Sequence, residues 1–211
     1  VSFPQGHLWL VCNITADDGG KTLDILRRWF DLFNGLGIKA AVLHPGGDDL
    51  HKAGVAAEKI REARVKALEY LVRHLEGSPL RLALENIPGS APGVEDLLPL
   101  IDTVGEEHLG ICLDTGHLNI SRGDPAAFVR RADKRLIALH IADNEGQHDQ
   151  HLMPYGRGTV PWKAFTKAVL EIGYAGLFNL EIPGERPCPL EVRLMKLDYL
   201  KRTMEFMLKD V

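Results

Sequence analysis

The sequence predicts a parallel α/β fold, and within that class a (β/α)8 barrel rather than an open sheet. Short apolar runs alternate with amphipathic helical segments along the whole chain, which is the pattern of parallel strand–helix units. Each of six runs reaches a His, Glu or Asp at its C-terminal end, and in a barrel these ends meet at one mouth. The GxGxxG fingerprint of open dinucleotide-binding sheets is absent. The barrel is therefore favoured.

Six apolar runs are predicted as strands. Each is almost continuously apolar, as expected for strands that are buried on both faces of a parallel sheet. The predicted strands cover residues 1–7, 38–46, 80–86, 109–117, 136–143 and 177–185.

Amphipathic helices are predicted between these strands. In Lys21–Leu36 the apolar side chains recur every three or four positions, and Gly37 marks the helix end. Asp124 followed by Pro125 is the pattern of an N-cap with proline at the first helical position. The other helices are predicted at 58–75, 94–104, 125–132, 161–172 and 190–208.

The length of the chain predicts one domain, residues 1–211, that is smaller than a full barrel. A complete barrel has eight units and about 250 residues, whereas 211 residues here contain six units and no internal linker or low-complexity segment. Hydrophobic residues make up 45% and charged residues 26%, as in ordinary globular domains. The open side of such a barrel would need a cover, either another segment or a neighbouring subunit in a homo-oligomer.

Charge and cysteine content restrict the class of protein. A net charge of −4 argues against nucleic acid as the main partner, since phosphate binding needs clustered Lys and Arg. Cys12, Cys112 and Cys188 are widely spaced, which predicts a reduced, cytoplasmic protein with Cys112 buried in a strand. We find no signal peptide and no apolar run of the ~18 residues that a membrane span needs. Because Val1 already belongs to a predicted strand, further residues are expected to precede it.

Four residues at strand ends predict a divalent-metal site. They are Glu85, Asp114, His140 and Glu181. A lone His or Glu at a strand end is more often capped or solvated, but four on successive strands are hard to explain in that way. Buried carboxylates that lie close together repel, and a divalent cation removes the conflict. The mixture of imidazole and carboxylate favours Mn or Zn, with Co, Fe and Mg as alternatives, over Ca.

Further polar residues are placed to extend this site. His117, Asp149 and His151 form a second group, and His7 and His44 approach from the other side of the mouth. Each has a simpler explanation as well. Loop histidines and aspartates are usually solvated, and a histidine before Pro-Gly-Gly can merely order a turn. These five residues are predicted as additional metal or substrate contacts.

Several of these segments resemble a known superfamily. The segments "LALEN", "GICLDTGH", "LHIADNEGQHDQH", "GRGTVPW" and "GYAGLFNLEIPGE" are similar to the xylose isomerase-like TIM barrels. This superfamily includes sugar-phosphate isomerases and epimerases, ketose 3-epimerases and apurinic-site (AP) endonucleases. The resemblance extends from about residue 7 to the C-terminus. It implies a TIM barrel that lacks the first one or two β/α units in this chain.

The epimerase pattern within the superfamily implies specific roles. It makes the four strand-end residues the metal ligands, with Glu85 and Glu181 also acting as the acid–base pair and His117 contacting substrate. One position departs from the pattern. Ketose 3-epimerases carry a substrate-binding Arg six residues after the ligand histidine, whereas Gly146 stands six residues after His140. This difference argues against a tagatose or psicose type of 3-epimerase.

The AP-endonuclease pattern also matches by residue type. It implies three zinc ions held by His7, His44, Glu85, Asp114, His117, His140, Asp149, His151 and Glu181. However, the Asp-Arg-His run that is typical of that family is Asp149-Gln150-His151 here. The stretch "PYGRGTVPW" resembles instead the PGxGxxxW loop of the sugar isomerases and epimerases.

The predicted activity is metal-dependent isomerisation or epimerisation of a sugar or sugar phosphate. The metal would hold two adjacent sugar oxygens and stabilise an enediolate, while Glu181 and Glu85 would remove and return the proton from opposite sides. Arg157 is a candidate for binding a phosphate or hydroxyl, and Trp9 for stacking on the sugar ring. A surface charge and packing at the barrel rim explain these two residues equally well.

Two alternatives stay open from the sequence. One is a zinc-dependent, AP-endonuclease-like phosphodiesterase, which would need several metals and a broad basic surface. The other is a non-catalytic sugar-binding barrel, which would fit the missing units.

Overall fold

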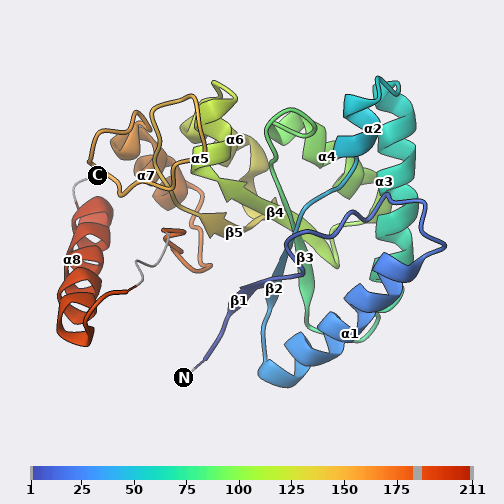
Figure 1. The fold of residues 1–211 in the computed structure, drawn as a ribbon, viewed down its shortest axis with the longest axis horizontal. Helices are drawn as coiled ribbons and strands as arrows, with labels where there is room; N and C mark the ends of the chain where they lie inside the picture. Colours follow the sequence, from blue (N-terminus) through green and yellow to red (C-terminus); the bar gives the residue numbers. More distant parts are fainter. Residues whose placement is uncertain (1, 183–186, 210–211) are drawn as a thin grey trace.

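Five parallel strands form a curled sheet that makes half of a barrel (Figure 1). The structure is a computed structural model and describes residues 2–182 and 187–209. The strands follow one another in sequence order, so each pairs with its neighbours in the chain. They are β1 (Gln5–His7), β2 (Ala40–Leu43), β3 (Arg81–Glu85), β4 (Leu109–Asp114) and β5 (Leu136–His140).

Helices cover the outer side of this sheet (Figure 1). Along the chain, α1, α3, α4, α6, α7 and α8 each pack against the next one, as the outer ring of a barrel requires. The helices are α1 (Lys21–Leu36), α2 (Asp48–Lys52), α3 (Ala57–Val72), α4 (Val94–Val104), α5 (Thr115–Ile120), α6 (Pro125–Ala132), the 3-10 turn η1 (Asp133–Arg135), α7 (Trp162–Glu171) and α8 (Leu190–Lys209).

The predicted sixth strand, residues 177–185, is wrong in extent. The described part of it makes one parallel bridge, in which Leu180 pairs with Ile141. Ile141 N donates to Asn179 O at 2.8 Å, and Glu181 N donates to Ile141 O at 3.0 Å. No described strand pairs with the other side of this segment, so a regular ladder does not develop. Residues 183–185 lie outside the described part of the chain, and so does residue 1 of the predicted first strand.

The predicted strand 109–117 is also too long, because the chain turns into a helix after Asp114. The Asp114 carboxylate caps α5 by accepting a hydrogen bond from His117 N at 2.7 Å. The same side chain therefore ends β4 and begins α5. This brings His117 back beside Asp114 at the mouth of the half-barrel. The short helix α2 was not predicted either.

Small side chains fill the inside of the curl directly beneath the strand ends. Strand periodicity places Ala83 on the same face as Glu85, because side chains two positions apart point the same way. Val42, Cys112 and Ala138 likewise stand two positions before a polar residue at or just after a strand end. The layer consists of Ala40, Val42, Ala83, Cys112 and Ala138. Cys112 is fully buried within β4, which confirms its prediction, and burial raises the pKa of its thiol to about 12.

The half-barrel confirms the prediction of an incomplete barrel.

Helix α8 stands apart from the sheet at one end of the molecule (Figure 1), and Met207 is its one buried residue in the described range. Its exposed apolar side chains are Leu190, Val192, Leu194, Met195, Leu197, Tyr199, Phe206 and Leu208. None of the helices in the described ranges combines the length and the hydropathy needed to cross a membrane.

Candidate metal centre

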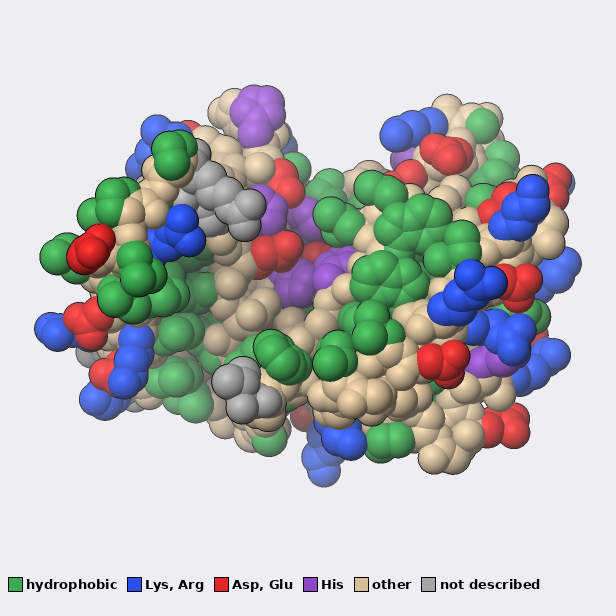
Figure 2. Space-filling model, turned by 60° about the horizontal axis from the view of Figure 1, so that its bottom comes forward, with side chains coloured by type: hydrophobic (Ala, Val, Ile, Leu, Met, Phe, Trp, Pro, Cys, Tyr) green, Lys and Arg blue, Asp and Glu red, His purple; other side chains and the backbone are tan. Residues whose placement is uncertain are grey.

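The four strand-end residues meet at the mouth of the half-barrel. Each of Glu85, Asp114, His140 and Glu181 offers one ligand atom, and these atoms all lie within 4.8 Å of one another. Glu85, Asp114 and His140 are the last residues of β3, β4 and β5, and Glu181 follows the bridge to β5. Figure 2 shows histidine and acidic side chains gathered in a hollow in the middle of the molecule. Three carboxylates and one imidazole therefore face a common point.

The state of Asp114 shows that this donor set fits a divalent cation. Asp114 is completely buried, and its Oδ2 has no hydrogen-bond partner among the described residues. Burial is the main cause that raises the pKa of Asp114 to about 7; the charge of His117 opposes this rise and the charge of Glu85 adds to it. A buried carboxylate oxygen without a donor is costly. A divalent cation at this point would supply the missing partner and neutralise the repulsion.

Glu85, Asp114, His140 and Glu181 are called the quartet below. His140 links its two glutamates. Its Nδ1 lies 3.0 Å from Glu85 Oε1 and 2.8 Å from Glu181 Oε2. Burial lowers the pKa of His140, but the nearby Cys112 thiol and the two carboxylates outweigh burial and raise the pKa above its ordinary value. Without a metal the imidazole therefore holds a proton between the carboxylates. A metal ion would have to displace that proton.

Glu85 also belongs to a second group of ligand atoms, formed with His7 and His44. His7 Nε2 lies 3.3 Å from Glu85 Oε2, and His44 Nε2 lies 3.2 Å from the same oxygen. Only 2% of the Glu85 surface is exposed. Burial raises its pKa, but hydrogen bonds from the histidines, that of His140 foremost, hold the pKa well below its usual range. One ionised carboxylate thus joins both groups.

The remaining predicted ligands form a chain on the other side of the quartet. Asp149 Oδ2 lies 3.4 Å from His117 Nε2 and 3.1 Å from His151 Nε2. The hydrogen bond from His117 lowers the pKa of Asp149. Burial lowers the pKa of His117, but the hydrogen bond with Asp149 and the charges of Asp114 and Glu85 outweigh burial and raise this pKa to about 9. The hydrogen bond with Asp149 also raises the pKa of His151 to about 9. His117 Nδ1 is 3.6 Å from Glu85 Oε1, so all nine predicted residues form one continuous cluster.

Asn86 fixes the positions of Asp114 and His117, and it was not predicted as a site residue from the sequence. Its Oδ1 accepts a hydrogen bond from Asp114 N at 2.8 Å, and its Nδ2 donates to Asp114 O at 3.1 Å. Its backbone oxygen lies 3.0 Å from His117 Nδ1. Asn86 is fully buried directly after Glu85. The signal available in the sequence was an amide at the end of an apolar strand, where a buried polar side chain needs partners.

Asp143 was also missed, and it anchors the loop that carries Asp149 and His151. Its carboxylate accepts hydrogen bonds from Trp162 Nε1 at 2.8 Å and from Val160 N at 3.1 Å. Asp143 and Leu152 also form an antiparallel bridge. The two ends of the loop 144–161 are thereby tied together through one buried carboxylate.

Replacing Gly158 by alanine is expected to loosen this loop. A Cβ at Gly158 would lie 2.0 Å from Asp143 Oδ1, so the carboxylate would have to move away from its hydrogen-bond donors. We expect the free energy of unfolding in urea to fall by about 1–3 kcal/mol. Gly35→Ala in α1 is the matched control, because its Cβ meets no atom within 4 Å and alanine favours the helix. Equal stability of the two variants would contradict the role of Asp143.

The two predicted substrate contacts stay predictions. Trp9 is partly buried and packs against the hydrophobic core, as rim packing would require. Arg157 is 68% exposed, and its Nε lies 3.7 Å from Glu145 Oε2. Neither side chain belongs to the nine-residue cluster.

Metal affinity is expected to rise with pH through the range around pH 7. Metal ligands must be deprotonated, and burial raises the pKa of Asp114 to about 7 in the metal-free site. Below that pH, Asp114 binds a proton that competes with the metal, and His140 also has a raised pKa. Calorimetric titration in buffers of different ionisation enthalpy measures both the affinity and the released protons. Affinity that is constant from about pH 6 to pH 8 would contradict this assignment.

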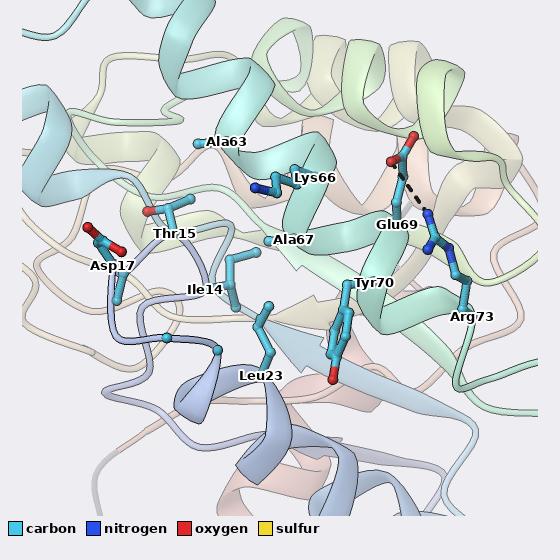
Figure 3. A pocket seen from close by; sticks show the side chains of 13 residues that line it. Ile14, Thr15, Asp17, Leu23, Ala63, Lys66, Ala67, Glu69, Tyr70 and Arg73 are labelled. Atoms are coloured by element: carbon cyan, nitrogen blue, oxygen red, sulfur yellow. Dashed lines mark ion pairs between the residues drawn. The ribbon is translucent and has the colours of Figure 1, made fainter.

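A separate cavity of about 580 Å³ lies between the loop before α1 and one face of α3 (Figure 3). Ile14 and Leu23 line one side, and Lys66 and Tyr70 of α3 line the other. None of the nine cluster residues lines it. This cavity is therefore separate from the candidate metal centre.

Comparison with known families and structures agrees with this architecture. Residues 3–209 match the family model described as a xylose isomerase-like TIM barrel. The crystal structure of a D-tagatose 3-epimerase-like protein is similar with a TM-score of 0.79 and 25% identity, over 98% of this chain and 78% of that one. The IOLI protein with a bound zinc atom has a similar fold, with a TM-score of 0.75 and 20% identity, over 92% of this chain and 72% of that one.

Three sequence relatives extend the comparison. Protein y4fM of Sinorhizobium fredii is 28% identical over 78% of this chain and 53% of its own length. A D-psicose 3-epimerase of Enterocloster bolteae is 33% identical over 41% of this chain and 27% of its own. A probable endonuclease 4 of Nitratidesulfovibrio vulgaris is 34% identical over 53% of this chain and 41% of its own. The chain thus spans about half the length of y4fM and less of the other two.

Proposed function

We propose that this chain, which belongs to the xylose isomerase-like TIM barrel family, forms the metal centre of a sugar or sugar-phosphate isomerase or epimerase. The observation that carries the proposal is the convergence of four ligand atoms within 4.8 Å at the mouth of the half-barrel. Solved structures of a D-tagatose 3-epimerase-like protein and of a D-psicose 3-epimerase share the fold, which supports this reaction class. A cytoplasmic location and a single domain over 1–211 are part of the same proposal.

Glu85, Asp114, His140 and Glu181 would hold the metal, with Mn or Zn favoured. When bound, such an ion supplies Lewis-acid polarisation of a substrate carbonyl. The orphaned Oδ2 of Asp114 supports the assignment, because it is a buried acceptor without a hydrogen-bond partner among the described residues and belongs to one of the four converging side chains. Asn86 would keep Asp114 in place through its paired hydrogen bonds to the Asp114 backbone.

The two glutamates differ in their exposure and surroundings, and this difference supports a separate role for each. The Glu181 side chain is 38% exposed, whereas that of Glu85 is 2% exposed and is enclosed by His7 and His44. Burial raises the pKa of Glu181, but the hydrogen bond from His140 outweighs it and keeps the pKa below its usual value. Glu181 is therefore ionised at neutral pH and accessible. In this proposal it removes the proton beside the carbonyl, and Glu85, after taking up a proton, returns that proton from the other side.

The surroundings of His44 support a small polar substrate. A cavity of about 240 Å³ adjoins this histidine, and Asn13, Asp48, Asp49 and Lys52 contribute polar groups to its lining. Such a mixture of donors and acceptors suits sugar hydroxyl groups. Arg157 at the loop surface is the candidate for a substrate phosphate.

Solvent-deuterium incorporation tests the proposal. Purified protein is loaded with Mn or Zn, its metal stoichiometry is measured, and a panel of ketoses, aldoses and their phosphates is incubated in deuterated water. Metal-dependent deuterium uptake at a carbon next to the carbonyl is the expected result. No uptake with any sugar would count against the proposal, and metal binding without uptake would favour a non-catalytic sugar-binding barrel.

A second candidate is a zinc phosphodiesterase that acts on abasic DNA. The observation in its favour is the further group formed by His7, His44 and Glu85, whose ligand atoms lie within 4.8 Å of one another and share Glu85 with the quartet. Similarity to a probable endonuclease 4 also supports it. Two to three zinc ions per chain, with metal-dependent cleavage of an abasic-site oligonucleotide and no deuterium uptake, would favour this activity.

A further inference from the structure

Arg64 is a buried cation on α3 that contacts two loops at the half-barrel mouth. Only 5% of its surface is exposed. Its Nε and Nη2 donate hydrogen bonds to Gly46 O at 3.0 and 2.7 Å, and Nη2 also donates to Ser90 O at 3.1 Å. The guanidinium group therefore bridges two backbone carbonyls that are 44 positions apart in the chain.

These carbonyls belong to the loops that carry two residues of the candidate site. Gly46 follows His44 by two positions in the loop after β2, and Ser90 follows Glu85 by five in the loop after β3. His44 Nε2 and Glu85 Oε2 are 3.2 Å apart. The hydrogen bonds of Arg64 thus hold the two loops that follow the contacting residues His44 and Glu85.

The local backbone is shaped to receive this arginine. Gly46 and Gly47 have φ angles of +70° and +86°, in the region that favours glycine. A Cβ on Gly47 would lie 2.7 Å from Ile60 Cγ2 and 3.2 Å from Arg64 Nε. The loop can approach α3 this closely because position 47 is glycine.

Two further contacts tie the neighbouring loops into the same unit. Asn13 Oδ1, in the loop after β1, accepts a hydrogen bond from Gly47 N at 3.4 Å. The Ser90 hydroxyl donates to the carboxylate of Asp48. The loops after β1, β2 and β3 are therefore held together on the side of the molecule where Arg64 enters.

We infer that Arg64 is a positioning residue that sets His44 against Glu85 through the Gly46 and Ser90 carbonyls. A buried cation is a costly way to join a helix to a sheet, because an apolar side chain of similar volume would pack without desolvating a charge. A planar fork of donors can fix two carbonyls at once, which an apolar side chain cannot. The catalytic part of this inference rests on the proposed function.

Three variants test the inference. Arg64→Met keeps most of the volume and removes every donor, and Arg64→Lys keeps the charge but loses the planar fork. Arg61→Met is the matched control, since Arg61 is on the same helix, has a side chain that is 41% exposed and pairs with Glu58 in the described structure. Circular dichroism and thermal unfolding establish that each variant is folded.

The first measurement is independent of any activity. In protein with ¹⁵N-labelled histidine, the ring resonances of His44 report its contact with Glu85. We expect these resonances to shift in Arg64→Met, to shift less in Arg64→Lys and to stay unchanged in Arg61→Met, while those of His151 stay unchanged in all three. Unshifted His44 resonances in folded Arg64→Met overturn the inference. If Arg64→Met does not fold, Arg64→Lys decides in the same way.

The second measurement is the deuterium exchange reaction at saturating metal. We expect kcat to fall by about tenfold or more in Arg64→Met, because a misplaced group at a reaction centre costs rate even when substrate still binds. Arg64→Lys should recover part of the rate, and Arg61→Met should match the wild type. A lower thermal midpoint with unchanged kcat would mean that Arg64 only stabilises the fold. A wild type without exchange activity overturns the proposed function, while the His44 resonances still test the positioning role.

Discussion

Glu181→Gln is expected to slow proton exchange at the substrate carbon by at least about 10²-fold, the usual scale for loss of a general base. Glutamine keeps the shape and one oxygen donor but cannot accept a proton. Glu181 is the accessible carboxylate of the quartet, and His140 keeps it ionised. We therefore expect that Glu85, which is buried, does not replace it. The rate of deuterium uptake from solvent, measured at saturating metal, tests this expectation.

Saturating metal is essential, since a neutral amide is a poorer ligand and metal affinity should fall as well. The control is Glu171→Gln, which removes an exposed carboxylate on α7 that pairs with Arg130. Full exchange activity in metal-loaded Glu181→Gln would assign the base to another residue. Loss of activity in both variants would point to instability instead of lost base catalysis.

The strand-end members of the nine-residue cluster could be predicted because of a simple property of parallel strands. The carboxyl ends of parallel strands meet at one edge, so polar residues that end successive apolar runs must approach one another. Glu85, Asp114 and His140 are the final residues of β3, β4 and β5. Nothing beyond strand periodicity was needed to place these three together, and Glu181 follows from the bridge between Leu180 and Ile141.

The supporting residues could not be predicted in the same way. Asn86 pairs with the backbone of Asp114, 28 positions away, and Asp143 binds Trp162, 19 positions away. Such contacts depend on how loops fold over the barrel mouth, which strand periodicity does not describe. Arg64 was hidden for a similar reason, because a charged residue in a charge-rich helix is normally solvated.

The helix α5 shows how one residue can change a prediction. The apolar run from residue 109 predicted a strand as far as residue 117, but Asp114 caps a helix and ends the strand. Its carboxylate has two oxygens with different tasks. Oδ1 accepts the His117 N–H, and Oδ2 is buried without a donor in the described structure. A residue that ends a strand and also begins a helix cannot be placed by periodicity alone.

Asp114→Asn is expected to stabilise the metal-free protein at alkaline pH. Burial raises the pKa of Asp114 from 3.8 to about 7, so the folded protein favours the protonated acid more than the unfolded chain does. The contribution of Asp114 is therefore most favourable below about pH 4 and is lost as pH rises through about 7. Asparagine has no charge to desolvate. We expect the metal-free variant to exceed the wild type by about 2–4 kcal/mol at pH 8 and by almost nothing near pH 4.

Metal should reverse this advantage. At a metal concentration of 100 times Kd, the wild type gains about 2.7 kcal/mol of stability, while the variant binds weakly and gains little. Urea unfolding with a chelator and with saturating Zn or Mn measures both differences, and Asp102→Asn, an exposed carboxylate paired with Arg135, is the control. If metal-free Asp114→Asn is less stable than the wild type at pH 8, the orphaned oxygen does not destabilise the fold. A variant that is more stable without metal and less stabilised by it would show that Asp114 is retained for binding at the expense of stability.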